Sequence, residues 1–285
     1  MAASDLATLA DVKTWLSGSS GIGSSDDALI ARLITDVSGA IYGYLSRPTL
    51  MPRSITERYN GSGKRRLYLR QYPVIAIASL TVDDVAVPAA PPPQAGGSWP
   101  PSGYLLDPWD GAPPGHIQAL DLFGVFSLGQ SYCAFAPGRQ NVVIAYTAGY
   151  QVSAEAAAVP SSPFQVAAQA PYGPWSSDAG VTYANGAALA KVSGSPGVGQ
   201  YAVAAGVYTF AAADAGAAVL ISYGFIPAAI NNACIEWVAE RYRYRTRIGQ
   251  SAQTVQGQQT ASYSLKDIPD FIRASLDPYR SVAAL

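Results

Sequence analysis

The spacing of apolar residues changes twice along this chain of 285 residues. It is helical at the N-terminal end, alternating in the middle and helical again near the C-terminal end. Spacings of three and four residues place side chains on one face of a helix, whereas alternation places them on one face of a strand. The pattern therefore predicts an α+β protein whose helices come from the two ends of the chain.

Two helices are predicted before residue 50. The first begins at Thr8 and Asp11, which have the spacing of a capping box. The second follows Asp26 and Asp27, whose charge suits a first helical turn, and Arg47-Pro48 stops it. The apolar stripes are Leu9, Val12 and Leu16 in the first helix and Ile30, Leu33, Ile34, Val37, Ile41, Tyr44 and Leu45 in the second. We expect these two helices to pack antiparallel.

Strands are predicted from residue 54 to residue 150. One hairpin is expected over Ile55–Leu69 with a Gly-rich turn at Asn60–Gly63, and another over Val74–Val87 with a turn at Asp83-Asp84. The strand Val142–Tyr146 closes this region.

A second β region is expected over residues 164–225, after a small-residue linker at 151–163. It ends in Val219–Phe225, which echoes Val142–Tyr146, and both copies end where a helix could begin. The echo is short, and alternating strands look alike, so by itself it is weak evidence for a repeat. Its position predicts that residues 151–225 are an insertion between a strand and the next helix.

The chain returns to helical spacing at Pro227. The helix that starts there carries Ile230, Cys234, Trp237, Val238 and Arg241 on one face, and Gly249 ends it. Gln250–Ser262 is polar and lacks periodicity, which predicts a loop or an arm that orders against a partner. A last short helix is expected from about Asp267, with the stripe Ile268, Phe271, Ile272 and Leu276.

These elements predict a helical bundle of two N-terminal and two C-terminal helices, with an antiparallel β region and an inserted small β-sandwich-like domain. The expected domains are a helical core from residues 1–53 and 226–285, the β region at 54–150 and the inserted domain at 151–225.

Composition excludes several classes of protein. With 49% hydrophobic and 13% charged residues, the chain is too apolar for disorder. Cys133 and Cys234 are far apart in apolar surroundings, so we expect free, buried thiols and assembly in a reducing cytoplasm. No run reaches the ~18 apolar residues that a membrane span needs, and the N-terminus lacks the pattern of a signal peptide. We therefore expect no membrane association.

No common catalytic or metal-binding pattern is present. A catalytic triad would have to use His116, the only histidine, which lies in a Pro/Gly-rich stretch. Zinc binding needs clustered Cys and His residues, and two isolated cysteines with one histidine cannot supply such a cluster. The segment Asn60–Lys64 has Arg58 where a phosphate-binding loop has its first glycine. The paired carboxylates Asp26-Asp27 and Asp83-Asp84 suit a helix start and a turn, so neither pair needs a catalytic role. The sequence predicts a protein that is not an enzyme and binds no cofactor.

A cluster of arginines and tyrosines ends the helix that begins at Pro227. Its members are Arg241, Tyr242, Arg243, Tyr244, Arg245 and Arg247, in a chain whose formal net charge is only −1. The helix dipole favours cations at this end by ~0.3–1 kcal/mol each, which accounts for one or two arginines. An assembly interface, a surface that faces phosphates and a solvated helix end remain alternatives.

Six segments together resemble the head-tail connectors of long-tailed phages and gene transfer agents, which are also called adaptor or head-completion proteins. The segments are Leu9–Leu16, Asp26–Ile30, Tyr146–Tyr150, Ile226–Ile230, Arg241–Gly249 and Ile268–Tyr279. The resemblance covers residues 6–150 and 226–282, and it lies in the order and spacing of these motifs.

The resemblance implies a structural protein of the virion neck, assembled in the host cytoplasm as a ring that is typically of twelve subunits. The implied partners are other copies of the chain, the portal protein and a tail-terminator or neck protein. Genomic DNA would pass through the ring without sequence-specific binding. By the same similarity, residues 250–285 would contact the portal, and Ile268, Phe271 and Tyr279 join the arginine-tyrosine cluster as a candidate assembly interface.

The chain departs from the family pattern by the insertion of residues 151–225. The insertion resembles small β modules of virion surfaces through Val181–Tyr183, Gly199–Tyr201 and Val207–Phe210. Two other functions are compatible with the sequence. One is a nucleic-acid-binding module that uses Arg241–Arg247, and the other is an adhesive or carbohydrate-binding β protein, suggested by the 18 tyrosines.

Overall fold

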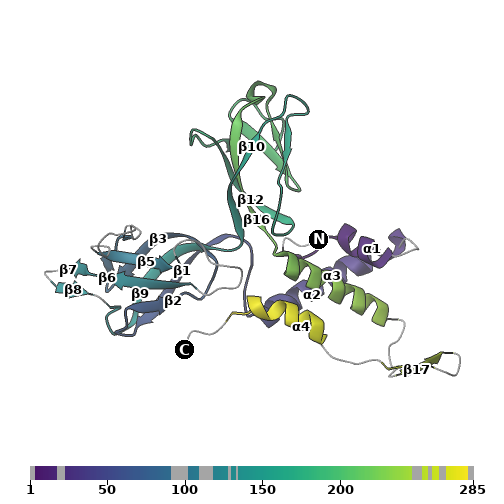
Figure 1. Cartoon of the computed structure of the whole chain (residues 1–285), viewed down its shortest axis with the longest axis horizontal. Coiled ribbons are helices and arrows are strands. Elements are labelled where there is room, and N and C mark those ends of the chain that lie inside the picture. The colour runs from purple at the N-terminus through teal and green to yellow at the C-terminus, as the bar shows by residue number, and fades with distance from the viewer. Residues whose placement is uncertain are drawn as a thin grey trace. The chain divides into compact units, whose positions relative to one another are not determined.

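The computed structural model describes residues 4–17, 23–90, 102–108, 118–127, 130–132, 134–245, 252–255, 259–262 and 268–281. The chain divides into two compact units. The helical unit combines Met1–Thr49, Tyr172–Pro174 and Ile226–Arg280, and the β unit combines Leu50–Pro171, Trp175–Phe225 and Ser281–Leu285. The α-helices and the mainly antiparallel sheets confirm the predicted α+β class (Figure 1).

The helical unit is built from both ends of the chain, as predicted. Its helices are α1 (Leu9–Ser17), η1 (Ser24–Asp26), α2 (Asp27–Leu45), α3 (Ala228–Tyr244), α4 (Asp270–Leu276) and η3 (Asp277–Tyr279), of which η1 and η3 are short 3-10 helices. α3 contacts α1, α2 and α4, which makes it the centre of the unit. The capping box is confirmed, because Thr8 Oγ1 donates to Asp11 Oδ2 at 2.6 Å and the Asp11 N–H donates back to Thr8 Oγ1 at 3.1 Å.

α2 provides one buried face of this unit. The side chains with no exposed surface are Ile30, Ile34, Val37, Ile41 and Leu45, which recur at the predicted helical spacing. Full burial of each contributes about 1.5–3 kcal/mol. The stretch Ser24–Leu45 is long and apolar enough to cross a membrane by length and composition. The apolar face of α2 is buried in the unit and α2 contacts α3, while 33% of the apolar window in this stretch is buried.

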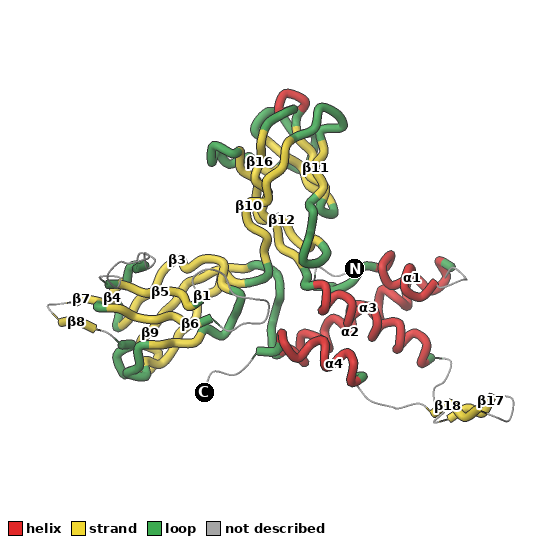
Figure 2. The backbone as a smooth tube through the Cα atoms, viewed as in Figure 1, coloured by secondary structure: helices red, strands yellow, loops and turns green. Residues whose placement is uncertain are grey.

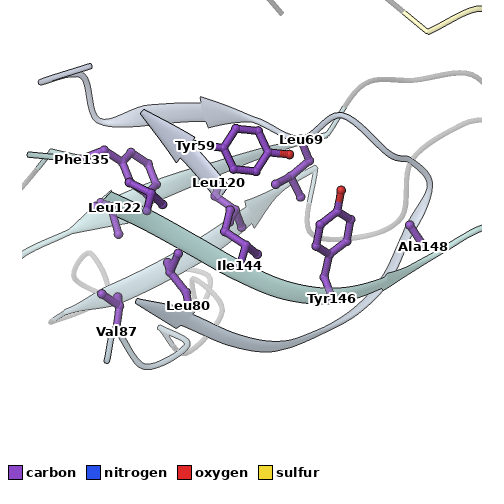
Figure 3. Packing of buried hydrophobic residues seen from close by; sticks show 11 residues of the cluster. Tyr59, Leu69, Leu80, Val87, Leu120, Leu122, Phe135, Ile144, Tyr146 and Ala148 are labelled. Carbon is purple, nitrogen blue, oxygen red and sulfur yellow. The ribbon is translucent and has the colours of Figure 1, made fainter. Parts of the chain in front are cut away.

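The first part of the β unit contains two sheets and a short ribbon. Its strands are β1 (Arg53–Gly61), β2 (Arg66–Tyr68), β3 (Val74–Val82), β4 (Val85–Ala86), β5 (Gly103–Asp107), β6 (Ala119–Phe123), β7 (Val125–Ser127), β8 (Gln130–Tyr132) and β9 (Gly138–Ala148). The sheets have the strand orders β1-β9-β3-β4 and β2-β6-β5, and β7 pairs with β8. One core takes side chains from both sheets, and Figure 3 shows them gathered between the strands.

Of the two predicted hairpins, one is confirmed and one is wrong. β3 pairs with β4, and Asp83 and Asp84 form the turn with φ angles of 50° and 62°. The hairpin over Ile55–Leu69 does not form, because β1 pairs with β9 and β2 pairs with β6. Tyr59 and Leu69 lie in one core but come from the two sides of it, so the Gly-rich segment connects two sheets.

The second part of the β unit is a smaller two-sheet structure (Figure 2). Its elements are β10 (Gln151–Ala158), β11 (Gln165–Ala167), β12 (Trp175–Tyr183), β13 (Ala190–Lys191), β14 (Gln200–Ala204), β15 (Val207–Phe210), η2 (Ala212–Asp214) and β16 (Ala218–Phe225). The sheets have the strand orders β10-β16-β12 and β11-β15-β14-β13, and a separate core joins them. This is the small β-sandwich that the sequence predicts.

The linker predicted at residues 151–163 is wrong in its first half, because Gln151–Ala158 forms β10. Alanine has a low intrinsic preference for strands, and this segment is rich in alanine. Pairing with β16, from Glu155 opposite Ile221 to Ala158 opposite Ala218, decides its conformation instead.

The polar segment Gln250–Ser262 contains an antiparallel hairpin and not only a loop or arm. It is formed by β17 (Ala252–Val255) and β18 (Gln259–Ser262), with Thr254 opposite Thr260. Two short polar strands that pair with each other leave no apolar period in the sequence, so the pattern gave no sign of them. α4 begins at Asp270, and Asp267 lies outside the described residues.

Replacement of Ile34 by alanine should destabilise the helical unit by about 2–5 kcal/mol, because it leaves a cavity where α2 is fully buried. The measurement is the free energy of unfolding by urea. Arg32→Ala on the same helix is the control, because Arg32 is exposed and should change stability by less than about 0.5 kcal/mol. Equal effects of the two variants would show that α2 is not a core helix.

Candidate assembly interface

α3 positions the arginine-tyrosine cluster at the end of a buried helix. Pro227 is the residue before the first helical position, and Ile230, Cys234, Trp237 and Val238 are buried as predicted. Arg241 continues their face, but its side chain is exposed. The helix therefore leaves the core close to Arg241.

The Arg241 guanidinium lies over a buried aromatic ring. Its carbon Cζ is 5.2 Å from the ring centroid of Trp237, which is only 3% exposed. This is within the range of a cation–π interaction. The apolar stem of Arg241 thus continues the buried face while the charged group reaches the surface.

Tyr242 and Arg245 bind Asp26, the residue directly before α2. The Tyr242 hydroxyl donates to Asp26 Oδ2, and Arg245 donates to both carboxylate oxygens of Asp26 at 3.2 and 3.1 Å. Arg245 also donates to the Tyr242 hydroxyl at 2.9 Å and lies 4.2 Å above its ring. A bidentate arginine–carboxylate pair is the best-defined ion-pair geometry. These two members of the cluster therefore connect two helices within one subunit.

The contact changes the protonation of its members. Hydrogen bonds from Arg245 and then from Tyr242 hold the pKa of the Asp26 carboxyl below its usual value. Donation to Asp26 raises the pKa of Tyr242. Since the pKa of Asp26 is lower in the folded chain, the contact stabilises the fold above the ordinary aspartate pKa, and this is lost as the pH falls through the lowered value.

The remaining members of the cluster differ in exposure. Arg243 is exposed and Tyr244 is half-buried, whereas Arg247 lies outside the described residues. In the described part of the cluster, Tyr242 and Arg245 thus bind Asp26 and Arg241 lies over Trp237, while Arg241, Arg243 and Arg245 are all exposed.

α4 carries the other candidate interface residues. Ile272 and Leu276 are buried, and α4 packs on α3. Phe271, which the sequence placed on the same stripe, is 56% exposed, so the stripe is narrower than predicted. Ile268 and Tyr279 are half-buried, and burial raises the pKa of Tyr279.

Two features of the helical unit were not predicted. The Tyr44 hydroxyl donates to Asp277, and the Arg280 guanidinium lies 5.5 Å from the Tyr44 ring centroid. These residues are far apart in the sequence, so no local pattern could have paired them. Trp15 is 54% exposed on α1, and its position beside the apolar stripe was the available signal.

The described residues offer little chemistry for catalysis. Burial raises the pKa of the Cys234 thiol to about 12, so it is not a nucleophile at neutral pH. Among the described residues, no group of three His, Cys, Asp or Glu side chains could hold a metal ion. Asp27 pairs with Lys13 at 2.7 Å, which fits a structural role at the start of α2. Cys133 and His116 lie outside the described residues.

No protein-family profile and no curated protein sequence matches this chain. A chain in the solved structure of the virion of a native gene transfer agent particle is similar with a TM-score of 0.40 and 14% sequence identity. The match covers 98% of this chain and 91% of that chain. A likeness of this degree establishes neither a family nor a function.

Removal of the Arg245 charge should raise the pKa of Asp26 toward that of a free aspartate. The variant is Arg245→Gln, and the measurement is an NMR titration of the labelled Asp26 carboxyl carbon. Arg241→Gln is the control, because Arg241 lies over Trp237 and should leave the titration unchanged. If the Asp26 titration were the same in wild type and Arg245→Gln, the ion pair would be absent in solution.

Proposed function

We propose that this chain is a structural protein of a virion, and specifically a subunit of the head-tail connector ring. In this role the subunits would form a ring, typically of twelve, under the portal protein. The ring would extend the DNA channel and give a tail-terminator or neck protein its attachment surface. Assembly would occur in the host cytoplasm.

One observation carries the proposal. Most of the connector-like motifs lie at the two ends of the chain, within residues 9–30 and 226–279, and these ends fold into one helical unit. α3, which begins at the proline-started motif and ends at the arginine-tyrosine cluster, is the centre of that unit. The sequence motifs therefore belong to one structural body, as a shared function requires.

The surface of the helical unit also supports assembly. Trp15 and Phe271 are 54% and 56% exposed, and Arg241 and Arg243 are exposed as well. Aromatic residues and arginine are the types enriched in protein–protein interfaces. A ring closes through heterologous contacts, so each subunit must present two different surfaces to its neighbours.

The electrostatics favour assembly over tight DNA binding. Arg245 is paired with the carboxylate of Asp26, which leaves a smaller net positive surface than the sequence suggests. Residues 226–285 carry 7 basic and 5 acidic side chains. A weakly charged surface suits a channel through which DNA slides, since affinity for duplex DNA rises with the number of neutralised phosphates.

Wild-type protein mixed with its portal should form rings under negative-stain electron microscopy, whereas Arg243→Glu should remain mainly monomeric. The reason is that a reversed charge in an interface adds repulsion and desolvation without touching the core. Arg32→Glu, an exposed arginine of α2, is the matched control and should still assemble.

Circular dichroism and thermal unfolding of both variants should match wild type, which separates loss of assembly from loss of folding. Persistent monomers of the wild type with the portal would contradict the connector function. Normal rings of Arg243→Glu would contradict only the role of Arg243. Salt-sensitive retention of duplex DNA by the isolated protein would favour the nucleic-acid-binding alternative.

A further inference from the structure

The two parts of the β unit share more than a short sequence echo. β9 and β16 carry the echoing segments Val142–Tyr146 and Val219–Tyr223. Each lies between the first and the third strand of its own part of the chain, and is the middle strand of those three. The echo therefore falls on equivalent strands.

The register of pairing also agrees around one position of the two sheets. Each middle strand has an isoleucine that faces a glutamate on the first strand and an aliphatic residue on the third strand. The two sets are Glu57, Ile144 and Leu80, and Glu155, Ile221 and Val181. The pairing stays in step from there to Tyr59 opposite Val142 and Ala157 opposite Val219, whereas toward the other end β10 has a register shift between Val152 and Glu155 that β1 lacks.

Both third strands have two register shifts in their pairing with the middle strand, and these shifts lie at corresponding positions. β3 shifts between Val74 and Ala76 and again between Ile77 and Ser79. β12 shifts between its corresponding residues, which are Trp175 and Ser177, and Asp178 and Gly180. A bulge bends and twists a strand at one place, and nothing in a sandwich as such requires two bulges at these positions.

The second sheets agree as well. Their common strand order is β2-β6-β5 in one part and β11-β15-β14 in the other. In both, a short parallel pairing follows on the outer side, between Ala89 and Tyr104 in the first part and between Ala190 and Gln200 in the second. The parts therefore share their topology across both layers.

A proline carbonyl precedes the third strand in each part and accepts the same hydrogen bond. The Gly149 N–H donates to the Pro73 carbonyl at 2.9 Å, and the Ile226 N–H donates to the Pro174 carbonyl at 2.9 Å. Gly149 and Ile226 follow the two middle strands at equivalent positions. The correspondence thus continues past the ends of the strands.

A buried tyrosine on each middle strand bonds to the glutamate of the first strand. The Tyr146 hydroxyl donates to Glu57 Oε2 at 2.7 Å, and the Tyr223 hydroxyl donates to Glu155 Oε2 at 2.5 Å. Each hydroxyl also accepts a backbone N–H. The donors are Gln71 at 3.3 Å and Ala170 at 2.9 Å. The same side-chain interaction is therefore built twice.

We infer that residues 53–148 and 151–225 are two copies of one β-sandwich module, and that the second copy is an insertion that folds as its own cooperative unit. The separate cores of the two parts support this second point. The ends of the second copy also meet, because the Phe225 N–H donates to the Tyr150 carbonyl at 3.1 Å and the two rings are 5.8 Å apart. A module whose ends meet can be inserted at low entropic cost.

Hydrogen exchange of the full chain, measured by mass spectrometry, tests this inference with a matched pair of cavity variants. Ile221→Ala should speed exchange in β10–β16 at least about tenfold and leave β1–β9 at the wild-type rate. Ile144→Ala should do the reverse. If either variant speeds exchange equally in both parts, they form one cooperative unit and the inference is wrong.

Two further variants test the equivalence and the insertion. Tyr146→Phe and Tyr223→Phe remove corresponding hydroxyls, so each should loosen only its own module, by similar factors; an effect from one alone would contradict equivalent copies. A chain with Tyr150 joined directly to Ile226 should keep wild-type protection in β1–β9. Loss of that protection would contradict the inference that the second copy is an insertion. These outcomes do not depend on ring formation, so they separate from a failure of the connector proposal.

Discussion

The packing of α3 against α2 is the constraint on which the rest of the structure depends, because it joins segments separated by both β modules. Two buried hydrogen bonds fix the N-terminal segment to these helices. The Asn231 amide donates to the Leu6 carbonyl at 2.8 Å, and the Leu6 N–H donates to Ser38 Oγ at 2.9 Å. Loss of one partner would leave a buried polar group at a cost of about 1–3 kcal/mol. Since the cost of loop closure rises slowly with length, the helical unit can hold a long β segment between α2 and α3.

Sequence patterns predicted the elements whose signals are local. The capping box at Thr8, the buried stripe of α2 and the turn at Asp83-Asp84 each depend on residues a few positions apart. The false hairpin over Ile55–Leu69 had good local signals too, but its strands pair with partners far along the chain. β10 was missed for a related reason, since an alanine-rich strand gains its conformation from β16. Local preference therefore neither pairs strands nor finds a strand whose conformation depends on its partner.

The candidate interface shows the same limit. Composition identified the arginine-tyrosine cluster, and the structure agrees that it ends α3. Composition could not reveal that Tyr242 and Arg245 bind Asp26, which is more than 200 positions away. Nor could it place Phe271 at the surface, because a short helix has too few turns to define its stripe. The residue types at a surface can be predicted from the sequence. Which of them stabilise the fold and which are available to a partner depends on long-range contacts.

The tyrosines of the second module illustrate how a composition can mislead about function. Many tyrosines suggest an adhesive surface, yet Tyr201, Tyr208 and Tyr223 are almost fully buried. Three hydroxyls of the module donate to its three carboxylates; the pairs are Tyr183 with Asp214, Tyr201 with Asp178, and Tyr223 with Glu155. A tyrosine fills a small core with its ring and satisfies an acceptor with its hydroxyl. Because burial of a carboxylate is costly without hydrogen-bond donors, a small sandwich can enclose carboxylates only beside such donors. Most tyrosines of this module therefore serve its packing, whereas Tyr172 is 62% exposed.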